Sequence, residues 1–188
     1  MNLLKAYFNY MENPEQGLHT LMQRRSFRQA CLGYFMATLS WVVFFNVGDG
    51  LSIPALVLKL FFVFIAEVTV GYCLASFAGL FLDLKKTPVS CAELFVLIGS
   101  AGWIKGLLIA GALISAMCPN AQLWLLAPLF LVGVLLLQLG YLTRGLMRIG
   151  TVSAARALGA WIIAFIPVCV LFGLIGVFGV WAIILLVS

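Results

Sequence analysis

Two long apolar stretches, about residues 55–82 and 91–117, each carry one ionisable side chain far from their ends: Glu67 in the first and Lys105 in the second. Each stretch exceeds the roughly 20 apolar residues that a helix needs to cross a bilayer. A single charge left alone inside the membrane costs about 2.5–3.5 kcal/mol on insertion scales. The chain must therefore fold so that these two charges compensate each other.

The positions of the two residues predict that they meet. Glu67 lies 15 residues before Leu82, and Lys105 lies 14 residues after Cys91. At a rise of about 1.5 Å per residue, both lie roughly 21–22 Å from the same membrane face if the two helices are antiparallel. We therefore expect Glu67 and Lys105 to form an intramembrane polar pair.

Small residues predict close helix packing around this pair. Gly71 and the two small residues after it follow Glu67 at steps of four, and a second set surrounds Lys105 in the next span. Such stripes let helix backbones approach each other in lipid, where no hydrophobic force acts between helices. We expect the stripes to face each other; their members are Gly71, Ala75 and Gly79 in the first, and Gly99, Gly102 and Gly106 in the second.

Composition excludes a soluble protein, because 64% of the 188 residues are hydrophobic and only 9% are charged. Soluble domains have about a quarter of their residues charged. The net charge of +5 does not indicate nucleic-acid binding, since the basic residues flank apolar spans. The five cysteines have no metal-binding spacing and the only histidine, His19, has no partner motif, so we expect no metal and no cofactor.

The pattern predicts an all-α integral membrane protein with five transmembrane helices and an N-terminal amphipathic surface helix over residues 2–12. Residues 1–28 form the expected cytoplasmic N-terminal amphipathic and basic segment, and 29–188 the transmembrane domain. A polar loop is expected between the last two spans. The expected spans cover about residues 29–47, 55–82, 91–117, 122–142 and 157–187.

The basic residues predict the orientation. They gather in the N-terminal segment and in the loops after the second and fourth spans, whereas the loops around Asp49 and Asn120 have no Lys or Arg. The positive-inside rule then places the N-terminus in the cytoplasm and the C-terminus outside. We expect contacts with lipid headgroups from Arg24, Arg25, Arg28, Lys85, Lys86, Arg144, Arg148 and Arg156.

Three short segments carry a resemblance to a known family: Asn13-Pro14-Glu15 before a basic run, Cys91-Ala-Glu93-Leu-Phe95, and Val152-Ser153-Ala-Ala-Arg156-Ala157-Leu158. With five spans, the chain resembles the Yip (Ypt-interacting-protein) family over residues 12–188. The resemblance implies a non-enzymatic protein. Eukaryotic members bind small GTPases, but they have a longer N-terminus with an Asp-Leu-Tyr-Gly-Pro stretch that this chain lacks. The small GTPase partner is therefore doubtful, and the short N-terminus resembles that of bacterial members, in the inner cell membrane.

Two functions remain open. The first is helix-mediated association or membrane and lipid organisation, with membrane lipids, copies of the same chain or other membrane proteins as partners. The second is a small-solute or proton transporter that uses Glu67 and Lys105, because ionisable residues inside a membrane often mark conduction routes. An intramembrane enzyme is not expected, since no Ser/His or paired-Asp arrangement falls at a common depth.

Overall fold

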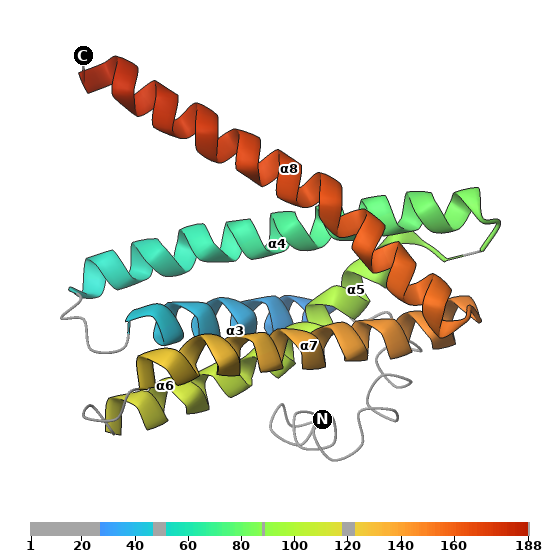
Figure 1. The fold of residues 1–188 in the computed structure, drawn as a ribbon, viewed down its shortest axis with the longest axis horizontal. Coiled ribbons are helices and arrows are strands. Elements are labelled where there is room, and N and C mark those ends of the chain that lie inside the picture. Colours follow the sequence, from blue (N-terminus) through green and yellow to red (C-terminus); the bar gives the residue numbers. More distant parts are fainter. Residues whose placement is uncertain (1–26, 47–51, 88, 118–122, 188) are drawn as a thin grey trace.

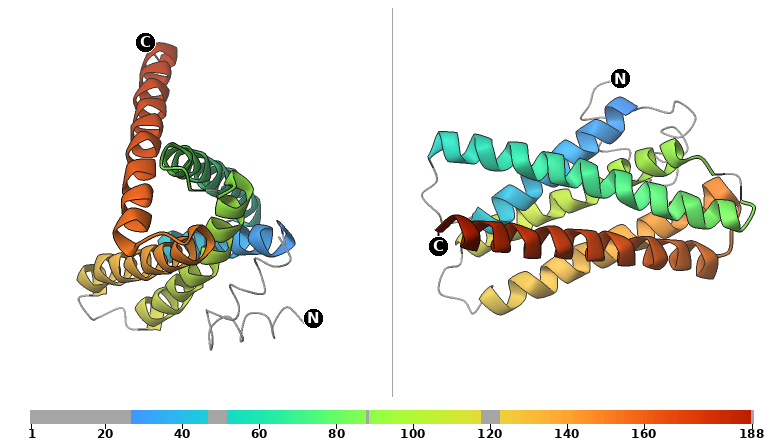
Figure 2. Two further views of the ribbon diagram at one scale, coloured as in Figure 1. Left: turned by 90° about the vertical axis from the view of Figure 1, so that its right-hand side faces the viewer. Right: turned by 90° about the horizontal axis from the view of Figure 1, so that it is seen from above.

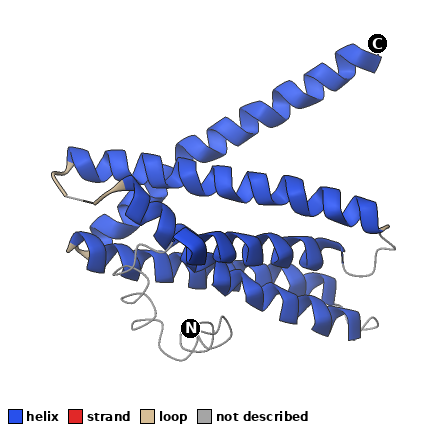
Figure 3. Ribbon diagram, turned by 180° about the vertical axis from the view of Figure 1, so that it is seen from behind, coloured by secondary structure: helices blue, strands red, loops and turns tan. Residues whose placement is uncertain are grey.

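The computed structural model describes residues 27–46, 52–87, 89–117 and 123–187. The described residues are almost all helical, and no strand occurs among them (Figure 3). Arg24, Arg25 and the expected surface helix over residues 2–12 lie outside the described residues. The helices are α3 (Phe27–Asn46), α4 (Ile53–Leu84), α5 (Cys91–Ala101), the 3₁₀ segment η1 (Gly102–Gly106), α6 (Leu107–Met117), α7 (Leu123–Gly150) and α8 (Ala154–Val187).

Four of the described segments are long and apolar enough to cross a membrane, which marks the chain as a membrane protein. They are Ile53–Leu84, Cys91–Ala116, Ala127–Gly150 and Ala154–Ile175. The helix α3 is not among them. It is 20 residues long and buries a face that includes small and hydroxyl side chains, among them Ala30, Thr38 and Ser40.

The helix α3 packs between α4 on one side and the continuous strip formed by α5, η1 and α6 on the other (Figures 1 and 2). Its remaining face is exposed at Phe27, Phe35 and Phe45. The helix α7 runs along the far side of that strip. The helix α8 crosses α4 with its N-terminal half, and its C-terminal half extends away from the other helices (Figure 1). The shared core of buried side chains includes Tyr34, Leu94, Leu97, Leu146 and Trp161.

The third expected span is not one regular helix. It begins with a capping box, in which Ser90 accepts a hydrogen bond from the Glu93 backbone N–H and Glu93 accepts one from the Ser90 N–H. It is α-helical to Ala101, changes to a 3₁₀ helix over Gly102–Gly106, and then continues as α6. A 3₁₀ stretch inside a helix often marks a functional hinge or local strain.

The prediction of a polar loop between the last two spans is wrong, because most of this segment is helical. The helix α7 continues to Gly150 and α8 begins at Ala154, so Arg144, Arg148 and Arg156 lie on helices. Gly145 is typical of a loop in water. Here it is buried instead, and a Cβ at this position would collide with the Leu97 side chain. This glycine allows close packing of α7 on α5, while the three arginines are exposed.

Candidate functional site

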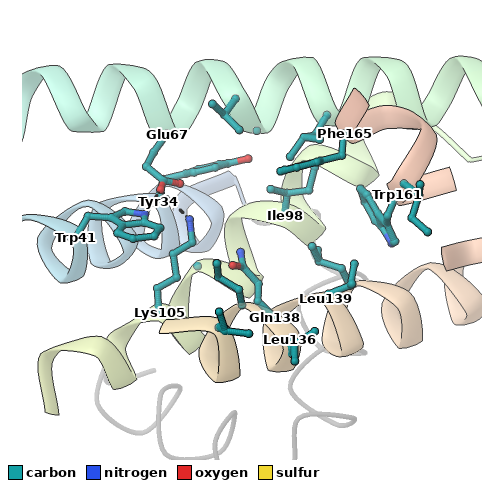
Figure 4. A pocket seen from close by; sticks show the side chains of 18 of the residues that line it. Tyr34, Trp41, Glu67, Ile98, Lys105, Leu136, Gln138, Leu139, Trp161 and Phe165 are labelled. Carbon is teal, nitrogen blue, oxygen red and sulfur yellow. Dashed lines mark hydrogen bonds and ion pairs between the residues drawn. The ribbon is translucent and has the colours of Figure 1, made fainter. Parts of the chain in front are cut away.

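The site is built around the ion pair between α4 and η1. Lys105 Nζ lies 2.7 Å from Glu67 Oε1, and the two side chains are only 9% and 16% exposed. The pair expected at a common depth is therefore present. Figure 4 shows the Lys105 side chain rising from η1 to meet the Glu67 carboxylate below α4.

A tryptophan of α3 completes the polar cluster. The Trp41 indole N–H donates a hydrogen bond to Glu67 Oε1, the oxygen that also accepts from Lys105. Lys105 Nζ lies 5.1 Å from the centre of the Trp41 ring, a distance at which an ammonium is attracted to the face of an indole. Glu67 thus accepts two donors, and Lys105 has both a carboxylate and an aromatic ring to compensate its charge.

The 3₁₀ segment holds Lys105 where α3 approaches most closely. A Cβ at Gly102 would collide with the Gly33 carbonyl, and a Cβ at Gly33 would collide with the Gly99 carbonyl. These glycines bring the backbone of α3 against the strip that carries Lys105. Because of this approach, Trp41 and Lys105 reach the same carboxylate from two different helices.

The sequence predicts that the two stripes of small residues face each other, but in the structure they are not in direct contact along their whole length. The Tyr34 ring of α3 separates them at the level of Gly71 and Gly99. A Cβ at Gly71 would lie 2.6 Å from Tyr34 Cε1, and a Cβ at Gly99 would lie 2.8 Å from Tyr34 Cε2. The Tyr34 hydroxyl donates to the Phe95 carbonyl at 3.2 Å. The sequence pattern indicated close packing but not the aromatic ring that uses the space.

The remaining small residues have other roles. Ala75 is fully buried in the core, and Gly79 packs on α5, where its Cβ would lie 3.6 Å from Leu94 Cδ1. Gly106, at the end of η1, is half-buried. Close contact between α4 and α5 therefore occurs at the Gly79 end, near the turn that joins them.

A cavity of about 650 Å³ lies beside the ion pair, with walls from α3, α4, α5, η1, α7 and α8. Most lining side chains are apolar, such as Ile98, Leu139 and Phe165. The polar exceptions are Tyr34, Trp41, Glu67, Lys105, Gln138 and Trp161. Figure 4 shows the Gln138 amide of α7 near Lys105, on the side of the cavity opposite α4. Cavities of this size and apolar character are typical of small-molecule sites.

The basic residues gather at one end of the bundle. The end of α4, the start of α5, the end of α7 and the start of α8 come together there, at the right of Figure 1. The side chains of Lys85, Lys86, Arg144, Arg148 and Arg156 are all exposed, as is that of Arg28 at the start of α3. Exposed cations next to a membrane-spanning segment attract anionic lipid headgroups.

Sequence reasoning missed Tyr34, Trp41 and Gln138. Gln138 had a usable signal, because it is a strongly polar residue in the middle of an apolar run. Trp41 and Tyr34 had none, since aromatic residues are common in apolar spans and nothing in the pattern relates them to Glu67. Among the described residues, no three His, Cys, Asp or Glu side chains lie close enough to hold a metal ion.

Comparison with known proteins gives no further guide. No family model, no curated protein and no solved structure matches this chain. The function must therefore be argued from the site itself.

Proposed function

We propose that this chain is a non-enzymatic, multi-pass membrane protein that organises membrane lipids by holding a lipid-like molecule in its intramembrane cavity. One observation supports this most strongly. The cavity of about 650 Å³ is lined mostly by apolar side chains, and its two charged residues are already paired with each other. Such a site offers apolar burial to a ligand and only a few polar groups to orient it.

We further propose that the protein is a minimal, bacterial-like member of the Yip type and that it resides in the inner cell membrane. It has five spans, with α3 as the first, the N-terminus cytoplasmic and the C-terminus outside. The basic end of the bundle faces the cytoplasmic leaflet. The buried face of α3 supports its inclusion, since a helix that packs on several neighbours needs less apolarity than one that faces lipid on all sides.

Native mass spectrometry of the full-length protein, released from mild detergent, tests the lipid-binding function. We expect lipid to remain on the wild type at one molecule per chain. A Leu136→Trp variant fills the cavity mouth and should lose it. Leu136 lines the cavity and is 62% exposed, so this change adds no strain to the core. Leu137→Trp is the matched control, because Leu137 is 59% exposed and does not line the cavity. Equal lipid retention by all three proteins would contradict the proposal.

A second candidate function is transport of a proton or small solute. Its support is that Glu67 and Lys105 line the cavity and that the span carrying Lys105 is interrupted by the 3₁₀ turn. Interrupted helices at mid-membrane are a feature of transporter sites. Flux in liposomes that contain the wild type, and its loss in Glu67→Gln, would favour this function. We rank it second because the pair neutralises itself.

A further inference from the structure

The cavity has polar groups that the protein does not use. Glu67 Oε1 accepts from both Trp41 and Lys105, while no hydrogen bond within the described residues involves Glu67 Oε2. The same holds for the Gln138 side chain, whose amide makes no hydrogen bond to any described residue. A third cavity-lining group, the Trp161 indole N–H, is fully buried and has no hydrogen-bond partner among the described residues. Because polar groups without partners are costly in an apolar wall, a ligand that supplies partners is favoured.

The charges of the site restrict the ligand's head group. Lys105 and Glu67 cancel each other in a wall that is otherwise apolar. An anionic or cationic head group would bring a third, uncompensated charge into this low-dielectric space. An uncharged head group avoids that penalty and can still bond to the groups left over.

The hydrogen-bonding capacity of the site restricts the head group further. Glu67 Oε2 can only accept, whereas the Gln138 amide both donates and accepts. A hydroxyl group matches this set, because its O–H donates to the carboxylate while its oxygen accepts from the amide N–H. A ketone or ester carbonyl alone would leave the carboxylate oxygen without a donor.

The other end of the cavity provides for an apolar chain. Leu136 of α7 and Phe165 and Ile166 of α8 line the cavity and are also 62%, 57% and 58% exposed. These residues therefore belong both to the cavity wall and to the outer, lipid-facing surface. The cavity opens sideways between α7 and α8, so the chain of a bound lipid can continue into the bilayer.

From these observations we infer that the cavity binds an uncharged, hydroxyl-bearing amphiphile, such as a monoacylglycerol, with its hydroxyl between Glu67 and Gln138 and its chain leaving between α7 and α8. This inference rests on the proposed lipid-holding function and adds the chemical class of the ligand.

The test uses a monoacylglycerol with a photoreactive diazirine in mid-chain, added to the full-length protein in detergent micelles. We expect adducts on the segments of α7 and α8 that line the cavity, around Leu136 and Phe165. Excess unlabelled monoacylglycerol should remove them. A fatty acid of the same chain length, ionised at pH 8, and a phosphatidylcholine should need concentrations about three- to tenfold higher, the effect expected for one net hydrogen bond.

Two variants locate the head group. Gln138→Leu keeps the size of the side chain and should weaken competition by monoacylglycerol about three- to tenfold. Leu137→Ala, on the same helix but outside the cavity lining, should leave it unchanged. Leu136→Trp should abolish the adducts whatever the effect of Gln138→Leu on folding, because it blocks the opening.

The outcomes separate this inference from the function on which it rests. Adducts in the cavity that all three lipids remove equally would overturn the head-group inference and leave the lipid-holding function standing. Stronger competition by the fatty acid would overturn it as well, by showing that the site prefers an anion. Absence of cavity adducts, with labelling only on outer surfaces, would overturn both.

Discussion

At the scale of single residues, the Glu67–Lys105 pair is the strongest energetic constraint in the molecule. Removing one partner leaves an ionisable group alone in an apolar wall, which costs more than removing both. Glu67→Gln and Lys105→Met should each lower the thermal stability of the protein in detergent. The double variant should be less unstable than the sum of the two losses, by a coupling of about 0.5–3 kcal/mol.

A matched control exists for this cycle. Lys59 lies on the same helix as Glu67 and is exposed, with its ammonium bonded to the Asn46 side chain. Lys59→Met combined with Glu67→Gln should give additive losses, since the two residues share no partner among the described contacts. Additive losses for Glu67 and Lys105 too would mean that the pair contributes no coupling energy, and the transport function would then gain support.

A second residue-scale prediction uses two glycines of one helix. Gly71→Ala should destabilise the protein by about 1–3 kcal/mol, because its Cβ would overlap the Tyr34 ring, which packs on α5 from the other side. Gly79→Ala makes only an ordinary contact with Leu94 and should be neutral or stabilising by up to about 1 kcal/mol. Thermal unfolding in one detergent checks both. Equal effects would show that Tyr34 does not occupy the space next to Gly71.

How far the sequence could predict the site depends on what a linear pattern records. The depth of Glu67 and Lys105 follows from counting residues, so the contact between their two helices could be predicted. The Trp41–Glu67 hydrogen bond could not, because the rotation and tilt of α3 depend on the close approach of Gly33 to Gly99 and Gly102. The cavity has the same origin, since its volume is set by how five helices and a 3₁₀ turn pack.

At the scale of the elements, α5 depends on its start. Ser90 and Glu93 form the capping box that satisfies two backbone N–H groups at the beginning of this largely buried helix. Ser90→Ala should lower the free energy of unfolding by about 1 kcal/mol, the usual cost of losing an N-cap. Ser76→Ala is the control, because the Ser76 hydroxyl donates to the Tyr72 carbonyl and contacts Cys91 Sγ at 3.7 Å, but accepts from no backbone N–H of α5. A Ser90→Ala variant as stable as Ser76→Ala would contradict the capping role.

The boundaries of the elements show where sequence patterns lose information. Hydropathy places the cores of α4, α5 with α6, and α8 correctly, because these runs are long and uninterrupted. It ends α7 too early, since Gly145 and the two arginines after Leu142 are typical of a loop in water. In a membrane protein the same residues extend a helix through the interface, with glycine packed on Leu97 and arginine exposed.

At the scale of the whole molecule, the end of the bundle with exposed basic residues defines a direction across the membrane. Lys85 and Lys86 follow α4, while Arg144 and Arg148 lie on the last turns of α7 and Arg156 on the first turn of α8. The positive-inside rule predicts that this end faces the cytoplasm. The helix α3 then decides the topology, because a crossing by α3 puts the N-terminus on the same side as this basic end.

Reporter fusions at three positions test that topology in cells. A reporter after Lys86 should read as cytoplasmic and one after Ser188 as extracytoplasmic, since α8 leads away from the basic end (Figure 1). A reporter placed before Asn2 separates five spans from four. It should be cytoplasmic if α3 crosses the bilayer, and extracytoplasmic if α3 is only a buried helix that returns to the side on which it began. As an internal control, a fusion after Asp49 should match the fusion after Ser188. An extracytoplasmic N-terminus, with the other three results as expected, would replace the five-span topology with one of four spans and would leave the α4–α8 arrangement intact.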